Sequence, residues 1–122
     1  MENEIDIKEA DKKIIFAEYL LNRPDNETYL PAAVRHILTA SNIAIRYLTN
    51  IDERQASSPQ LIQRALVKFE EKESIEFSKF YLSFWKSLME PPSSANISEN
   101  LRKVKAFISW VKSQKHRKNI QN

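Results

Sequence analysis

The absence of glycine is the feature that most constrains what this chain can fold into. At the usual frequency of about 7%, a chain of 122 residues would contain roughly eight or nine glycines. Glycine supplies the positive φ angles on which phosphate-cradling loops, dinucleotide fingerprints and nucleophile elbows depend. The sequence therefore excludes these sites, and it disfavours two-residue β-hairpins for the same reason.

The chain also has no cysteine, so it contains no disulfide, thiolate metal site or catalytic thiol. Its two histidines, His36 and His116, are distant in sequence, and neither has a carboxylate three or four residues away, the spacing at which a helix pairs metal ligands. The carboxylates between Glu70 and Glu76 are mixed with lysines, which favours a solvated ion-pair face. We therefore expect no metal site and no cofactor.

The net charge of +3 is unevenly distributed along the chain. The segment from Glu99 to Lys118 holds seven basic residues and one acidic residue, whereas the rest of the chain is net negative. No apolar run approaches the roughly 18 residues that cross a bilayer, and the acidic N-terminus is unlike a signal peptide. We expect a cytoplasmic protein with no membrane association and a local positive field.

Apolar residues recur at three- and four-residue steps along most of the chain, and no segment has the two-residue period of a strand. The pattern predicts helices at about 5–22, 30–49, 59–71, 74–89 and 98–115, all in one domain. Segment 59–89 is either two helices that meet near residue 72 or one long bent helix. The expected fold is all-α, an antiparallel up-and-down bundle of four or five helices.

The expected helix boundaries carry polar or proline signals. Thr28, Ser58 and Ser98 are predicted N-caps, and Pro31 and Pro59 are expected in first turns, where proline is tolerated. These signals suggest that no connection requires a left-handed glycine cap.

The second predicted helix combines a small-residue seam with a polar stripe. Ala33, Ala40 and Ala44 would let a neighbouring helix approach closely. The polar stripe would remain available for binding; it comprises Arg35, Thr39, Asn42 and Arg46.

The last predicted helix carries the strongest indication of a binding function. Its basic stripe could hold phosphates while Phe107 or Trp110 stacks on a base. The stripe comprises Arg102, Lys105, Lys112 and His116. Alternatively, Phe107 is core, the lysines only solubilise the surface, and Trp110 and Trp85 cover a partner protein. Glutamates at 102, 105 and 112 are predicted to abolish RNA or nucleotide binding with melting nearly unchanged.

Two segments resemble a known family. EADKKIIFAEYLL (Glu9–Leu21) and AAVRHILTASNIAIRYL (Ala32–Leu48) are similar to the opening helix pair of the HEPN superfamily (higher eukaryotes and prokaryotes nucleotide-binding). They also look like the related substrate-binding subunits of minimal nucleotidyltransferases. The resemblance covers about the first 50 residues. It implies a four- or five-helix bundle, often dimeric, that is a metal-independent ribonuclease or the non-catalytic partner of a nucleotidyltransferase.

The catalytic members of that superfamily carry an Arg followed about four to six residues later, roughly a helical turn or more, by a His. Here Arg35 directly adjoins His36, and His116 has Lys112 rather than an Arg upstream. No nuclease residue can be carried over. We therefore expect a non-catalytic HEPN-like bundle that binds a partner protein, a nucleotide or RNA. The alternatives are an atypical ribonuclease using His36 or His116 across a homodimer, and a purely structural interaction bundle.

Overall fold

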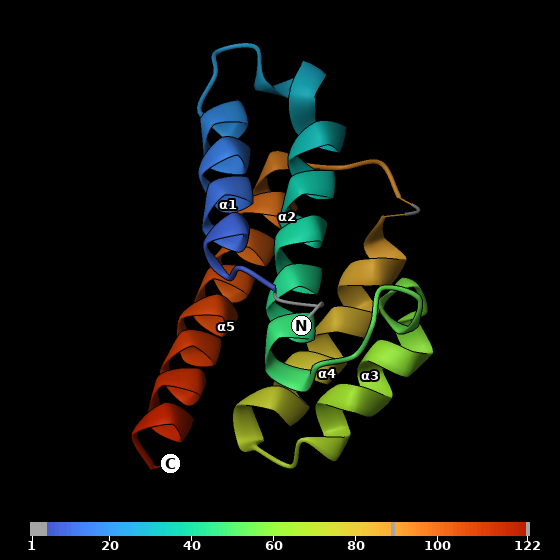
Figure 1. Cartoon of the computed structure of the whole chain (residues 1–122). Helices are drawn as coiled ribbons and strands as arrows, with labels where there is room; N and C mark the ends of the chain where they lie inside the picture. The colour runs from blue at the N-terminus through green and yellow to red at the C-terminus, as the bar shows by residue number, and fades with distance from the viewer. Residues whose placement is uncertain (1–4, 89, 122) are drawn as a thin grey trace.

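The computed structural model describes residues 5–88 and 90–121, and it describes side-chain environments as far as Gln114. In these residues the chain forms five α-helices, one short 3-10 helix and no strand, which confirms the predicted all-α class (Figure 1). The elements are α1 (Lys8–Leu21), α2 (Asn26–Thr49), η1 (Gln55–Ser57), α3 (Pro59–Lys68), α4 (Lys72–Ser87) and α5 (Ser94–Gln121).

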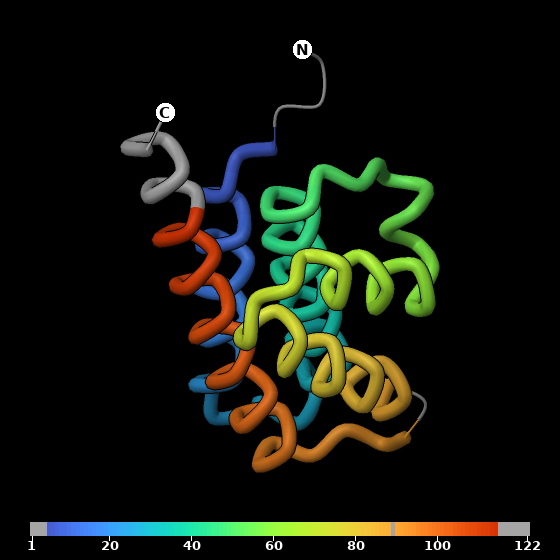
Figure 2. Tube along the Cα trace, turned by 90° about the horizontal axis from the view of Figure 1, so that it is seen from below, coloured from blue at the N-terminus to red at the C-terminus, as the bar shows by residue number. Residues whose placement is uncertain are grey.

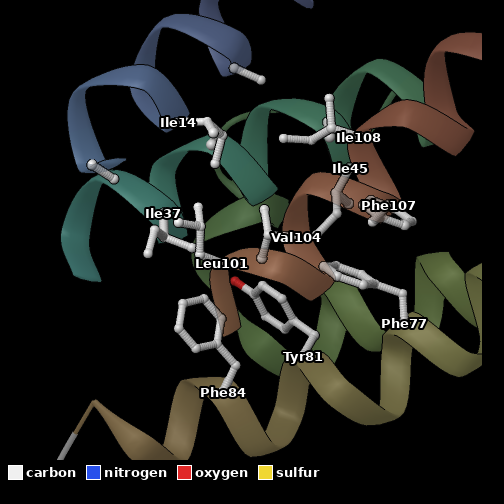
Figure 3. Packing of buried hydrophobic residues seen from close by; sticks show 14 of the residues in the cluster. Ile14, Ile37, Ile45, Phe77, Tyr81, Phe84, Leu101, Val104, Phe107 and Ile108 are labelled. Atoms are coloured by element: carbon white, nitrogen blue, oxygen red, sulfur yellow. The ribbon is translucent and has the colours of Figure 1, made fainter. Parts of the chain in front are cut away.

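The helices form a bundle of two antiparallel hairpins and a last helix. α1 and α2 make the first hairpin, and α5 lies beside both of them (Figure 1 and Figure 2). α3 and α4 make the second hairpin, on the side of α2 away from α1. Buried residues from all five helices belong to one hydrophobic cluster, whose centre is shown in Figure 3.

Small side chains fill the core between α1 and α2, and large aromatic side chains fill it beside α4. Ala33, Ala40 and Ala44 of α2 are fully buried, as predicted, and so are Ala10 and Ala17 of α1. Alanine lets helix backbones come close together, because the spacing of two helices depends on the side chains between them. The backbones of α1 and α2 accordingly approach each other along their lengths.

Aromatic side chains hold α4 against the rest of the bundle instead. Phe77, Tyr81 and Phe84 point from α4 into the core, where Phe77 meets Phe107 of α5 (Figure 3). The Tyr81 hydroxyl donates a 2.8 Å hydrogen bond to Asn42 Oδ1 of α2, and burial raises the pKa of Tyr81 to about 12. These rings are larger than alanine, and the α4 and α5 backbones come close at few points.

Segment 59–89 is broken into two helices, one of the two possibilities left open by the sequence. α3 ends at Lys68 and α4 begins at Lys72, with Glu70 in the left-handed region at φ 68°. The Ser74 hydroxyl donates a buried 2.6 Å hydrogen bond to the carbonyl oxygen of Leu66, which joins the two helices across the turn. The connection between Lys68 and Lys72 therefore forms the turn of a helical hairpin.

Left-handed residues end two of the helices, although the chain has no glycine. Asn50 terminates α2 at φ 66° and donates its N–H to the Arg46 carbonyl at 2.8 Å. Asparagine adopts this conformation more readily than most residues, whereas at Glu70 the Cβ makes it costly by roughly 1–2 kcal/mol. No described connection therefore requires glycine, as expected, but two connections are nevertheless left-handed, which the boundary signals did not indicate.

One predicted N-cap is confirmed and two are wrong. The Ser58 hydroxyl accepts the Leu61 N–H at 3.3 Å at the start of α3. α2 begins at Asn26, before Thr28, so Pro31 lies inside the helix rather than in its first turn. α5 begins at Ser94, before Ser98, and Ser93 Oγ accepts the Asn96 N–H at 3.2 Å. Both helices thus begin about a turn before the predicted residue, and at α5 a local hydrogen bond that hydrophobic periodicity does not register caps the extra turn.

Candidate functional site

The basic stripe predicted on α5 is divided between two surfaces. Lys105 Nζ lies 2.7 Å from Glu18 Oε2, and Lys112 Nζ lies 2.7 Å from Asp11 Oδ2, so both lysines form ion pairs with α1. Arg102 instead pairs with Glu99 of its own helix, with 3.3 Å between Nε and Oε1, and faces another side of α5. The three described residues of the stripe are therefore all ion-paired, the two lysines with α1 and Arg102 within α5.

A groove of about 390 Å³ runs between α4 and α5 on the surface that Arg102 borders. It lies where aromatic side chains separate the two helices. Its lining comes from both helices: Glu73, Glu76, Phe77 and Phe80 of α4, and Arg102, Lys103, Ala106, Phe107 and Trp110 of α5. The groove is therefore an apolar floor between two charged rims.

Four rings form the floor of this α4–α5 groove. Phe77 and Phe107 stack nearly parallel, with ring centroids 3.8 Å apart and planes 5° apart. Trp110 continues from Phe107 at 5.9 Å and also meets the edge of Phe69 at 6.1 Å. Phe80 and Trp110 are only partly buried, so the floor presents aromatic surface to the groove. Such surfaces are suited to stacking with a planar ligand.

The rims of the α4–α5 groove carry opposite charges. On the α5 rim, Lys103 Nζ lies 5.3 Å from the centroid of the Phe80 ring, and the hydrogen bond that Arg102 donates to Glu99 raises the pKa of Arg102. On the α4 rim, Glu73 and Glu76 are exposed and form no ion pair within the described residues. The groove thus offers Lys103, the ion-paired Arg102 and two carboxylates beside an aromatic floor.

The other predicted binding residues lie elsewhere. Arg35 is exposed and borders a smaller pocket of about 200 Å³ beside the α4–α5 connection. Arg46 is half-buried, and its Nε donates to the Ile51 carbonyl oxygen at 3.4 Å, so it holds the linker. Asn42 is likewise engaged with Tyr81. The polar stripe predicted on α2 therefore does not form one open surface.

Trp110 lies in the α4–α5 groove, whereas Trp85 is half-buried on α4 and does not line it. The side chain of His116 lies outside the described residues. Among the basic residues predicted to bind, Arg102 is the one for which the structure shows a place in the groove; the others are Lys105, Lys112, His116, Arg35 and Arg46.

His36 lies on α2 against α1, where the edge of its ring meets Phe16 with centroids 4.8 Å apart at 80°. Burial lowers the pKa of His36, and the positive charges of Lys13 and Arg35 lower it further. No carboxylate contributes to this shift, so nothing holds the imidazole in its charged form. The environment is that of a neutral, structurally packed histidine.

We expect this lowered pKa to make folding stability depend on pH below about 6.5. The unfolded chain, with His36 at its ordinary pKa of 6.5, takes up a proton that the folded chain resists, so stability falls as pH drops through this range. His36→Phe keeps a ring against Phe16 but cannot titrate. Urea midpoints measured between about pH 7 and pH 5.5 should fall less in this variant than in the parent; equal slopes would contradict the assignment.

α1 exposes an apolar patch that the sequence analysis did not identify. Ile15, Phe16 and Tyr19 are 65%, 45% and 55% exposed. Arg23 donates a 3.0 Å hydrogen bond to the Tyr19 hydroxyl and lies over the Tyr29 ring, which fixes one end of the patch. The signal was present in the sequence, because the run from Ile14 to Leu21 has more apolar residues than one helix face can bury.

Lys103, Phe80, Glu73 and Glu76 were not singled out as site residues, because each looks ordinary on its own helix. Lys103 is one base among seven near the C-terminus, and the glutamates belong to a mixed charged stretch. Their significance comes from the pairing of α4 with α5, which hydrophobic periodicity does not specify. The available signal was a charged residue one helical turn before an aromatic residue on each helix, Glu76 before Phe80 and Lys103 before Phe107.

No group of three or more His, Asp or Glu side chains in the described part of the chain is arranged to hold a metal ion. The same residues contain no helix that is long and apolar enough to span a bilayer.

Comparison with protein-family models gave no match, and neither did comparison with curated proteins or with solved structures.

Proposed function

We propose that this protein is a non-catalytic helical bundle that binds a nucleotide, either free or as an exposed residue of RNA, in the α4–α5 groove. The observation that carries the proposal is the placement of Arg102 and Lys103 beside the partly exposed rings of Phe80 and Trp110. A base stacks on aromatic rings while cations neutralise its phosphate. The groove volume of about 390 Å³ is within the range of small-molecule sites.

The chemistry of the groove supports binding rather than cleavage. Its described lining contains no histidine, and its titratable groups are exposed carboxylates and cations without a nucleophile beside a base. His36 packs against Phe16 on another part of the bundle. An RNA held in the groove would therefore not meet His36, one of the two histidines on which the ribonuclease alternative depends.

The HEPN-like resemblance of Glu9–Leu21 and Ala32–Leu48 adds independent support, because it implies a nucleotide-related bundle. If the chain functions like the proteins it resembles, its protein partner is a nucleotidyltransferase or a second copy of this chain. The exposed residues Ile15, Phe16 and Tyr19 lie on α1, do not line the groove, and provide apolar surface for such a partner.

A steric block tests the site directly. Ala106 is exposed in the groove, so Ala106→Phe should fill the groove without entering the core. Trp85→Phe serves as the background, so that Trp110 is the remaining tryptophan. The four nucleoside monophosphates are titrated singly to about 1 mM while Trp110 fluorescence is recorded. We expect a saturable change with at least one of them, weakened at least tenfold by Ala106→Phe.

Ser109→Phe is the matched control, because Ser109 is exposed on α5 and does not line the groove. This variant should bind like the parent. Two outcomes would overturn the proposed function: no fluorescence change with any of the four nucleotides, or unchanged binding by Ala106→Phe.

A further inference from the structure

The charges of the α4–α5 groove are separated along its length. α4 runs antiparallel to α5, as the contacts of Phe77 with Phe107 and of Phe80 with Lys103 show. The carboxylates of Glu73 and Glu76 therefore lie toward the Trp110 end, and the cations lie toward the Phe80 end. At 1.5 Å per residue, Glu76 and Glu73 precede Phe80 by roughly 6 and 10 Å along α4.

A nucleotide in this groove has a preferred direction, because its phosphate is attracted to one end and repelled by the other. Lys103 and Arg102 lie at the Phe80 end, so the phosphate binds there. The base then lies toward Trp110, with an edge facing the glutamates on the α4 rim. Both carboxylates are exposed and without an ion-pair partner among the described residues, so they are available to that edge.

An ionised carboxylate accepts hydrogen bonds and donates none. The base edge that faces it must therefore present donors. Guanine offers two adjacent donors, N1–H and the N2 amino group, which one carboxylate can accept together. In adenine and cytosine the amino group adjoins a ring nitrogen that is itself an acceptor, and in uracil the N3–H lies between two carbonyl oxygens. Each of these three edges places an acceptor against the carboxylate.

We propose that the α4–α5 groove selects guanine nucleotides, with the base stacked at Trp110, its N1–H and N2 amino group donating to Glu73 or Glu76, and its phosphate at Arg102 and Lys103. This inference rests on the proposed function and adds the identity of the base and its direction in the groove. A bidentate hydrogen bond to a base edge discriminates by about 1–3 kcal/mol, which corresponds to a roughly ten- to hundredfold difference in affinity.

The test compares GMP, IMP, AMP and guanosine by the fluorescence of Trp110 in the Trp85→Phe background. Inosine keeps N1–H but lacks the N2 amino group, so IMP should bind between GMP and AMP, and AMP should bind roughly ten- to hundredfold more weakly than GMP. Guanosine should bind more weakly than GMP, because it has no phosphate to meet Lys103 and Arg102. Glu73→Gln with Glu76→Gln should abolish the preference for GMP, because GMP loses its bidentate acceptor and AMP no longer places an acceptor against a carboxylate.

Different outcomes would overturn guanine selection and nucleotide binding. Equal affinities for GMP and AMP, both lost in Ala106→Phe, would overturn guanine selection and leave nucleotide binding in place. A preference for GMP that survives both glutamine substitutions would also overturn the assignment of the carboxylates. No binding by any probe, together with dimerisation that Ala106→Phe abolishes, would overturn both, since a second copy of the chain would then close the groove.

Discussion

Truncation of Phe84 to alanine is expected to destabilise the protein by about 3–5 kcal/mol, the usual cost of removing a buried phenylalanine. Phe84 is 2% exposed and stacks on Phe80 with ring centroids 5.5 Å apart. It belongs to the set of rings through which α4 packs on the rest of the bundle (Figure 3). The melting temperature should fall by roughly 10–20 °C in a chain of this size.

Phe16→Ala is the matched control for that experiment, because it makes the same substitution at a ring that is 45% exposed. Its expected cost is about 1 kcal/mol, mostly from the lost contact with His36. Circular dichroism melts and urea titrations of the two variants measure the difference. Similar losses in both variants would mean that α4 is not held by buried aromatic rings.

Reversal of the two groove cations, Arg102→Glu with Lys103→Glu, should weaken nucleotide binding more than about hundredfold, because two charge-assisted contacts become repulsive. Both side chains are exposed, and neither contributes to the buried core. Arg102→Glu breaks only the exposed Arg102–Glu99 ion pair, so the melting temperature should change little. Fluorescence titration and thermal melts on the same samples measure the two effects together.

Lys105→Glu with Lys112→Glu is the matched control, since it reverses two charges on the same helix. These lysines form ion pairs with Glu18 and Asp11 of α1. Reversal should therefore lower the free energy of unfolding by about 1 kcal/mol or less per pair and leave nucleotide binding unchanged. This expectation replaces the sequence-based one, in which glutamates at 102, 105 and 112 act alike. Loss of nucleotide binding in this control would mean that a general positive field, rather than the groove, attracts the ligand.

Local patterns were sufficient to predict most of the helices. The apolar steps identified five helical segments, the alanines of α2 were correctly expected to be buried, and the Ser58–Pro59 pair marked the start of α3. Each of these features depends on residues within a few turns of one another. The early starts of α2 and α5 were missed because their first turns are polar and carry no apolar spacing; at α5 the first turn is capped by Ser93.

The candidate site was predicted less well, because it depends on which helices become neighbours. Helical spacing alone places Arg102, Lys105 and Lys112 on one stripe. In the folded chain the two lysines form ion pairs with α1, whereas Arg102 borders the α4–α5 groove. Glu76 and Lys103 lie on different helices and line one groove in the folded chain. The absence of glycine removed whole classes of sites, but it did not prevent left-handed turns at Asn50 and Glu70.

The most direct measurement of the central claim is a map of backbone amide chemical shifts during a titration with GMP. If the nucleotide binds in the α4–α5 groove, the amide signals that shift with added GMP belong to the groove-lining residues of α4 and α5, with Ala106 and Trp110 among them. The amides of Ile15, Phe16 and Arg35 should not move, since they lie on other surfaces. Shifts confined to α1 or to the surroundings of Arg35, or none at all, would contradict it.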